Sequence, residues 1–266
     1  MGLIDTDRLT ELTKVENEPY HFKPDPKIIY EPGFKAAEYS PLASNPYSGC
    51  THACEYCFMR MRMKPAKRQR WDTDPSPKPD YVNKLKYKVR KMAGDEREIL
   101  FSFSADVYQP IETELKLMRE AIKVMIDNDM RFTVLTKGGL NAARDFDLLQ
   151  NYDKCSFGST IVFLDEKMKD VWEPGAPTIK DRISALQKAK EAGIKTWVSL
   201  EPVIDAKQAI RVIKKLHPIV DHWKIGKVNY HPVEKDTDWL AFKKDVVETL
   251  ESVGADYKLK FSLMNL

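Results

Sequence analysis

Three of the four cysteines in the chain lie within eight consecutive positions, at Cys50, Cys54 and Cys57, in the segment NPYSGCTHACEYCF. Three residues separate the first two cysteines and two residues separate the second two. Thiolates are the ligands of structural zinc and of iron–sulfur clusters, so this crowding indicates a metal centre. The fourth cysteine, Cys155, is about a hundred residues away and helps to decide which metal fits.

A structural zinc site needs four ligands, which usually come as two separated pairs. Here His52 would have to complete the set, and its closeness to Cys54 makes that geometry cramped. A disulfide is disfavoured where thiols stay reduced. An iron–sulfur cluster held by three thiolates fits the spacing best, and it leaves one iron open to amino and carboxylate groups of a substrate or cofactor. A zinc site and a site without metal are the alternatives.

The elements that must position these cysteines follow from short apolar runs that alternate with segments of helical periodicity. We predict strands near residue 43 and at 98–104, 131–137, 155–164, 195–203 and 221–228, helices at 82–93, 112–129, 140–152, 179–193, 206–217 and 237–252, and a possible last strand within 257–264. This alternation predicts an α/β fold with a parallel sheet and crossover helices. About six units predict a barrel or part of one, with sites at the C-terminal ends of the strands. The cysteine segment follows the first strand.

The chain divides into three predicted parts. Residues 1–40 show weak periodicity and are expected to form a poorly structured N-terminal arm. Residues 41–232 form the barrel, and residues 233–266 form a C-terminal helix and strand packed on it. No apolar run reaches the length of a membrane span and no signal peptide is recognised, so we expect a cytoplasmic protein without a membrane partner.

Charge is unevenly distributed along the chain. The net charge is +3, yet residues 60–91 carry twelve Lys or Arg against three Asp. Such a basic stretch could attract a polyanion such as nucleic acid. The alternative is a solvated helix face together with a basic loop.

The cysteine motif, with Tyr56 before the third cysteine, resembles the signature of radical S-adenosylmethionine (SAM) enzymes. Further segments are similar, in order, to the branch that includes spore photoproduct lyase and its relatives of DNA-repair-photolyase type: ADVYQPIE (105–112), LTKGG…RD (135–145), WEPGAPTIKDRISAL (172–186) and IGKVN (225–229). The resemblance covers roughly residues 41–230. It implies a partial (β/α)6 TIM-like barrel, which agrees with the strand count.

The resemblance also implies the chemistry. Cys50, Cys54 and Cys57 would bind a [4Fe-4S] cluster, and SAM would be the second cofactor. An electron from an external flavodoxin- or ferredoxin-like donor would cleave SAM to methionine and a 5′-deoxyadenosyl radical, which takes a hydrogen atom from the substrate. The reaction on the substrate would be of lyase or transferase type.

Residues near the strand ends are implied as SAM contacts. Tyr56 is expected beside the adenine, Ser104 and Asp106 at the methionyl amino group, Lys137 and Arg182 at the methionyl carboxylate, Ser159 at the methionyl group or ribose, and Glu201 and Asn229 at the ribose or substrate. The alternative for Tyr56 is a core aromatic residue, and for Arg182 an exposed helix residue. We interpret Glu173 as a cap or turn residue, and His52, His217, His222 and His231 as structural.

One position departs from the branch. Spore photoproduct lyase returns a hydrogen atom from a cysteine near the end of its second strand, and that place falls near Ser102 here, whose O–H bond is too strong for this role. Cys155 opens the fourth strand and is expected to be a small buried hydrophobic residue. Three hypotheses follow: a radical SAM enzyme acting on nucleic acid, one acting on a peptide or small molecule, and a non-catalytic metal-binding module.

Overall fold

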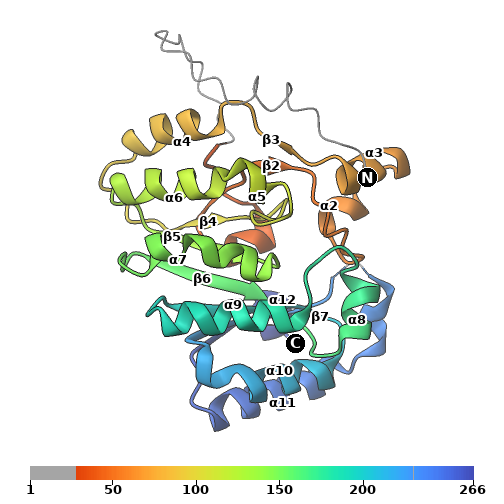
Figure 1. Ribbon diagram of the computed structural model, residues 1–266. Helices are drawn as coiled ribbons and strands as arrows, with labels where there is room; N and C mark the ends of the chain where they lie inside the picture. Colours follow the sequence, from red (N-terminus) through yellow and green to blue (C-terminus); the bar gives the residue numbers. More distant parts are fainter. Residues whose placement is uncertain (1–27, 230) are drawn as a thin grey trace.

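A curved parallel sheet forms the centre of the protein (Figure 1). The computed structural model describes residues 28–229 and 231–266. The sheet has seven strands in chain order: β1 (Leu42–Ser44), β4 (Ile99–Phe101), β5 (Phe132–Thr136), β6 (Cys155–Thr160), β7 (Thr196–Val203), β8 (His222–Lys227) and β9 (Tyr257–Leu259). Every neighbouring pair is parallel. The predicted parallel α/β partial barrel is therefore confirmed.

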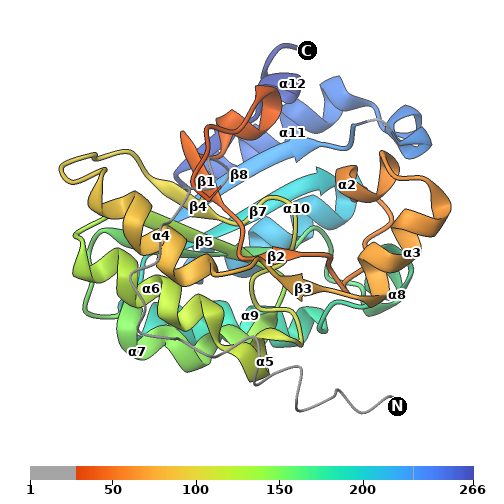
Figure 2. The same ribbon diagram turned by 90° about the horizontal axis from the view of Figure 1, so that it is seen from above.

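Helices cover the outer, convex face of the sheet (Figures 1 and 2). The longer ones are α4 (Tyr81–Arg90), α6 (Leu117–Asp127), α9 (Ile179–Glu191), α10 (Ala206–Leu216) and α11 (Trp239–Ser252). In α10 the buried residues Ala209, Val212, Ile213 and Leu216 repeat at helical spacing, which places one apolar stripe against the strands. The Asp205 side chain accepts a hydrogen bond from the Gln208 amide at 2.8 Å and caps this helix.

Shorter elements complete the connections between the strands. They are η2 (Gly139–Asp145), α7 (Phe146–Leu149), α8 (Glu166–Trp172), η3 (His217–Ile219) and η4 (Pro232–Asp236). The helix predicted at 112–129 is divided into α5 (Glu112–Leu115) and α6, because Lys116 takes a left-handed conformation with φ of 52°. The segment 257–264 is divided as well, since β9 is followed by the short helix α12 (Phe261–Met264).

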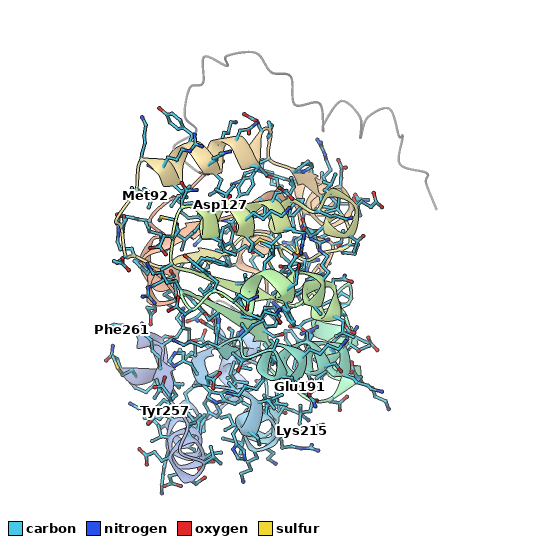
Figure 3. The ribbon with its side chains drawn as sticks, turned by 60° about the vertical axis from the view of Figure 1, so that its left-hand side comes forward. Met92, Asp127, Glu191, Lys215, Tyr257 and Phe261 are labelled. Carbon is cyan, nitrogen blue, oxygen red and sulfur yellow. The ribbon has the colours of Figure 1, made fainter. Side chains whose placement is uncertain are left out.

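Figure 3 shows how regularly the crossovers repeat. Met92, Asp127, Glu191 and Lys215 lie within two residues of the C-terminal ends of α4, α6, α9 and α10, and Figure 3 shows the first two above the last two. Because neighbouring strands are parallel, each crossover returns the chain to the N-terminal edge of the sheet, and the loops that follow the strands lie at the C-terminal edge. Within the described residues, no helix combines the length and apolar character that crossing a bilayer would need.

Residues 28–40 form a strap that joins the two edges of the sheet. At the β1 edge, Tyr30 exchanges backbone hydrogen bonds of 3.0 and 2.9 Å with Ala43. Near the β9 edge, Lys258 donates to the Glu38 carbonyl at 2.8 Å, and the Phe261 amide donates to the Glu38 carboxylate at 2.5 Å. The strap includes the 3-10 helix η1 (Phe34–Glu38), which lies beside α12 in Figure 2.

The prediction of a poorly structured arm is therefore wrong for residues 28–40. The prediction failed because it relied on periodicity, which is weak in this segment. Ile28 and Ile29 are nevertheless buried against the rest of the protein. Residues 1–27 lie outside the described residues. The boundaries proposed at residues 40 and 232 stay predictions.

The connection between β1 and β4 contains the three clustered cysteines and several short elements. After β2 (Tyr47–Ser48) come the cysteines, then α2 (Phe58–Met61) and α3 (Pro65–Thr73), and then β3 (Ser76–Pro77), which pairs antiparallel with β2. The first part of the basic stretch 60–91 is thus helical, in α2 and α3. The β2–β3 pairing returns the chain to the sheet before α4 begins.

Candidate cofactor site

Residues 49–57, here called the cysteine loop, lie at the C-terminal edge of the sheet and are held in place by Gln109. The Gln109 side chain donates to the Gly49 carbonyl at 3.0 Å and accepts from the Thr51 amide at 3.1 Å. These two bonds flank Cys50, and Gln109 is fully buried. Sequence reasoning did not single out Gln109, although it lies inside the ADVYQPIE segment.

The helices α2 and α3 support the same loop from its other side. The Cys50 amide donates to the Trp71 carbonyl at 2.8 Å. Arg60 donates to the Cys54 carbonyl at 2.8 Å and forms an ion pair with Asp72 at 3.0 Å. Cys57 is itself the N-cap residue of α2. The backbone of all three cysteines is therefore tied to this helix pair.

A second loop, residues 172–177, packs directly on the cysteine loop. The Glu55 amide donates to the Trp172 carbonyl at 2.9 Å, and the Gly175 amide donates to the His52 carbonyl at 3.1 Å. A Cβ atom at Gly175 would lie 1.9 Å from the Thr51 carbonyl oxygen. Only glycine allows this approach, which explains the residue type in the WEPGAP segment.

Glu173 and Arg182 form a buried ion pair beneath the cysteine loop. Their side chains are fully buried and lie 2.5 Å apart. Tyr56 donates its hydroxyl to Glu173, and Arg182 also donates to the carbonyls of Pro177 at 3.1 Å and Thr160 at 3.2 Å. Burial works against the charged carboxylate, but Arg182 and Lys137 outweigh it, so the pKa of Glu173 is lowered.

Two interpretations of the sequence are corrected by this pair. Arg182 is not an exposed helix residue, because α9 turns its first turn inward against Glu173. Glu173 is not simply a cap or turn residue, since its carboxylate joins Tyr56 to Arg182. The sequence held no local signal for this, because the two charges are nine residues apart and on different elements.

Asp106 links the loop after β4 to the end of β5. Its carboxylate accepts from the Thr136 hydroxyl at 2.6 Å, the Lys137 amide at 2.6 Å and the Tyr108 amide at 2.9 Å. The His52 ring nitrogen Nδ1 lies 3.5 Å away. Asp106 therefore positions neighbouring backbone, and its predicted contact with the SAM amino group stays a prediction.

The residues around Asp106 complete this side of the site. Asn45 accepts from the amides of Phe103 at 2.8 Å and Ser104 at 2.9 Å, which fixes the backbone of Ser104. Ser159 on β6 donates to the Thr136 carbonyl at 3.2 Å. Ser104 and Ser159 thus both lie at strand ends near Asp106.

Lys137 brings a positive charge to the cysteines. Its ammonium lies 5.5 Å from the centre of the Tyr56 ring. Burial works to lower the pKa of Lys137, but Cys54 and Glu173 more than offset it, so the pKa is raised. Among the described residues we find no ion pair that neutralises this ammonium. Tyr56, Asp106, Lys137 and Arg182, predicted from four segments, are therefore gathered on one side of the cysteine loop.

Glu201 and Asn229 belong to a different cluster, around the strap. Glu201 on β7 accepts from the Tyr39 hydroxyl at 2.5 Å and from Lys260 at 3.2 Å. A Cβ at Gly226 would lie 2.6 Å from the Glu201 carboxyl carbon, so Glu201 packs against the backbone of β8. Asn229 accepts from Lys35 of the strap at 2.6 Å.

The cysteine loop has the donors that an iron–sulfur cluster needs. All three thiols are free, and burial raises the pKa of Cys50 to about 12 and raises that of Cys54 as well. Thr51 Oγ1 and His52 Nε2 are buried and have no hydrogen-bond partner among residues 28–229 and 231–266. In the described part of the chain, no three His, Cys, Asp or Glu side chains converge as a single metal ion requires. A cluster of several irons does not need its sulfur ligands to meet at one point.

Cys155 and Ser102 lie outside this group of donors. Cys155 starts β6, at the end of the strands opposite to the cysteine loop, and its thiol donates to the Tyr152 carbonyl at 3.1 Å. It is buried, as the sequence predicts for a small hydrophobic residue. The Ser102 hydroxyl donates to the Ala105 carbonyl within its own loop.

The sequence profile of the Radical SAM superfamily matches residues 44–207. An uncharacterised protein of Methanocaldococcus jannaschii is 33% identical over 160 residues, which are 60% of this chain and 59% of that protein. An uncharacterised protein of Acidianus two-tailed virus is 28% identical over 215 residues, 74% of this chain and 70% of its own length. Three mycobacterial proteins are 26% identical over 168 residues, and this chain spans only 48% of their length.

Solved structures with a similar fold are also found. A spore photoproduct lyase variant with a dinucleoside spore photoproduct matches with a TM-score of 0.66 and 12% identity, covering 84% of this chain and 77% of that one. SuiB of Streptococcus suis, bound to S-adenosylmethionine, matches with a TM-score of 0.61 and 12% identity, covering 82% and 49%. At these identities the likeness concerns the fold.

Proposed function

The chain belongs to the radical SAM superfamily, and we propose that Cys50, Cys54 and Cys57 bind a [4Fe-4S] cluster beside a SAM site on the C-terminal strand ends. The observation that carries this proposal is the cysteine loop itself. It presents three free thiols and two buried polar atoms, Thr51 Oγ1 and His52 Nε2, that have no hydrogen-bond partner in the described part of the chain. An unpaired buried polar atom costs free energy, so a ligand that satisfies it stabilises the loop.

The side chains around the loop support a SAM site. The methionyl part of SAM carries an ammonium and a carboxylate, and Lys137 is a half-buried cation beside the cysteine loop that has no ion pair among the described residues. We therefore assign Lys137 to the carboxylate. Ser104, Asp106 and Ser159 remain the candidates for the polar edge of the methionyl group, and Tyr56 for the adenine, because all four lie on this side.

Some predicted contacts are better explained as support. Arg182 is already paired with Glu173, so its proposed role is to hold Tyr56 through that carboxylate. Glu201 and Asn229 belong with the strap, so we assign them to the wall of the half-barrel interior, where the substrate enters. The Tyr39 and Trp197 rings, 6.2 Å apart, form part of the same wall.

When bound, the cluster supplies the electron that cleaves SAM to methionine and a 5′-deoxyadenosyl radical able to remove a hydrogen atom from a substrate. The chain contributes orientation and exclusion of water. Gln109, Arg60 and Gly175 fix the cysteine loop, and the strap closes the side of the half-barrel. The thiols must stay reduced, so we place the protein in the cytoplasm.

For the substrate, the positions of the basic residues support a peptide or small molecule over nucleic acid. The basic stretch 60–91 does not form a continuous surface. Its second half lies on α4, which covers the outer face of the sheet and runs away from the cysteine loop (Figures 1 and 2). Fluorescence anisotropy at low salt tests this choice. Binding of an oligonucleotide would favour nucleic acid as the substrate.

The proposed function is tested by anaerobic reconstitution with iron and sulfide. We expect four irons per chain, and dithionite reduction should then yield 5′-deoxyadenosine from SAM. Alanine at Cys50, Cys54 or Cys57 should remove the cluster, whereas Cys155→Ala should retain it and serves as the matched control. One zinc per chain, unchanged by iron and sulfide, would refute the proposal in favour of a non-catalytic metal-binding module.

A further inference from the structure

The outer wall of the cysteine loop is an unusually exposed and basic helix pair. The segment from Phe58 to Thr73 contains six Lys or Arg and one acidic residue, Asp72. None of the residues of α2 and α3, all of which the structure describes, is buried. A helix of nine residues without a buried face gains little from packing on its own protein. Its sequence is explained more directly by a partner outside the chain.

Two of the six basic residues have a task within the protein. Arg60 holds the Cys54 carbonyl and Asp72, and Arg68 donates to the Arg60 carbonyl at 3.1 Å. The other four, Arg62, Lys64, Lys67 and Arg70, are exposed. In the described part of the chain the side chains of Lys64, Lys67 and Arg70 form no hydrogen bond or ion pair. Arg62 lies 5.9 Å from the ring of Phe58, which is itself 43% exposed.

This surface is directly joined to the backbone of the three cysteines. Cys57 caps α2, Arg60 of α2 bonds Cys54, and Trp71 of α3 accepts the Cys50 amide. Each of the three cysteines is therefore within one covalent or hydrogen-bonded step of α2 or α3. A donor docked here would therefore have a short route to the cysteines. A short route matters because the rate of electron transfer between proteins falls steeply with distance.

We propose that Arg62, Lys64, Lys67 and Arg70, with Phe58 among them, form the docking surface for a small acidic one-electron carrier protein. The inference rests on the proposed function, because each reductive cleavage of SAM consumes one electron. The carrier is oxidised by one electron and the cluster is reduced by one. Opposite charge steers such an encounter and raises its rate at low salt, while an exposed aromatic side chain supplies apolar contact.

Nucleic acid is the competing partner for a basic surface. It is less favoured here because the basic residues of α2 and α3 lie beside the cysteine loop, whereas those of α4 lie apart from them on the outer face of the sheet (Figures 1 and 2). Phe58 and Trp71 are the aromatic residues of the helix pair, and Trp71 is partly buried against the loop, which leaves little surface for base stacking.

The test uses the full-length reconstituted protein and a reduced, acidic flavodoxin as the probe. The variant carries Lys64→Gln, Lys67→Gln and Arg70→Gln. Its matched control carries Lys86→Gln, Arg90→Gln and Lys91→Gln, which remove the same charge from exposed positions of α4 and of its C-cap residue. Stopped-flow absorbance follows cluster reduction, and anisotropy of labelled flavodoxin measures binding independently of turnover. Dithionite, which needs no docking surface, reports on the cluster and SAM site in every variant.

We expect the α3 variant to reduce its cluster about tenfold or more slowly with flavodoxin at low salt, and to lose most of its salt dependence. The control should match the parent protein, and dithionite-driven SAM cleavage should be equal in all three. The inference is overturned if flavodoxin reduces the cluster at the same rate in the parent, the α3 variant and the control. It is also overturned if the α3 variant and the control lose the same fraction of this rate. A variant that loses oligonucleotide binding but keeps the flavodoxin rate overturns it in favour of nucleic acid. Failure of dithionite-driven cleavage in the parent refutes the proposed function instead.

Discussion

The buried pair formed by Glu173 and Arg182 is the residue-scale feature on which the cysteine loop most depends. Replacing Arg182 by Met leaves a fully buried carboxylate without its counter-charge, which should cost about 3–5 kcal/mol of the free energy of unfolding. Urea denaturation measures this loss. Changing Glu173→Leu in the same chain should recover much of it, because two apolar side chains then replace two charges. A single variant as stable as the parent would contradict the buried pairing.

Lys137 makes a different prediction, because it is charged, close to the cysteines and without an ion-pair partner in the described residues. Lys137→Met should weaken SAM binding by about 1.5–3 kcal/mol, the usual range for a charge-assisted hydrogen bond. Isothermal titration of the reconstituted protein with SAM gives the affinity, and cluster absorbance should be unchanged. Lys123→Met, which removes an exposed lysine paired with Glu120, is the matched control. An unchanged SAM affinity would remove Lys137 from the site.

The sequence allowed the residues of the site to be predicted, but not the contacts that each side chain makes. The cysteines, Tyr56, Asp106, Lys137 and Arg182 were all predicted, and the structure brings them together. Asp106 and Arg182, however, are engaged by other residues of the chain, Asp106 by the Lys137 amide and Arg182 by Glu173. Such partners are distant in sequence, so no local pattern could reveal them. Gln109 was missed because a glutamine that clamps backbone has no characteristic spacing.

The contact between the loop at 172–177 and the cysteine loop can be tested at Gly175. Gly175→Ala would place a methyl group against the Thr51 carbonyl and must move the two loops apart. We expect fewer irons per chain after reconstitution, while far-ultraviolet circular dichroism of the helices stays the same. Gly33→Ala is the control, because a Cβ there meets nothing within 4 Å. Full iron occupancy in Gly175→Ala would show that the loop contact does not position the cysteines.

The central strands could be predicted because they are buried over nearly their whole length, and the longer helices because they bury residues at helical spacing. β5 and β6 are almost wholly buried, and the runs 131–137 and 155–164 are apolar in the sequence. The helices α2 and α3 could not be predicted in this way, since a helix without a buried face has no apolar period. The break at Lys116 was missed for a related reason: apolar residues continue through it, and only the backbone conformation changes.

At the scale of the whole molecule, the strap converts an open sheet into a closed wall. An open half-barrel leaves two strand edges, at β1 and β9, that are distant in sequence. The strap contacts both, and Tyr39 anchors it by donating to Glu201 while Lys260 lies 4.3 Å from its ring centre. Burial, followed by the negative charge of Glu201, raises the pKa of Tyr39, so the phenol stays protonated and remains a donor.

This arrangement predicts that the two edges loosen together. Tyr39→Ala removes the anchor, so amide hydrogen exchange should speed up both in residues 28–44 and in residues 257–264, which are more than 200 positions apart. Peptides from β5 and α6 should keep their protection. Phe146→Ala, which removes a ring that packs 4.9 Å from Phe157, is the control and should act on α7 and β6 but not on the edges. Faster exchange in residues 28–44 alone would mean that the strap is only an extension of β1, and that the half-barrel is held at β9 by α12 and α11 without it.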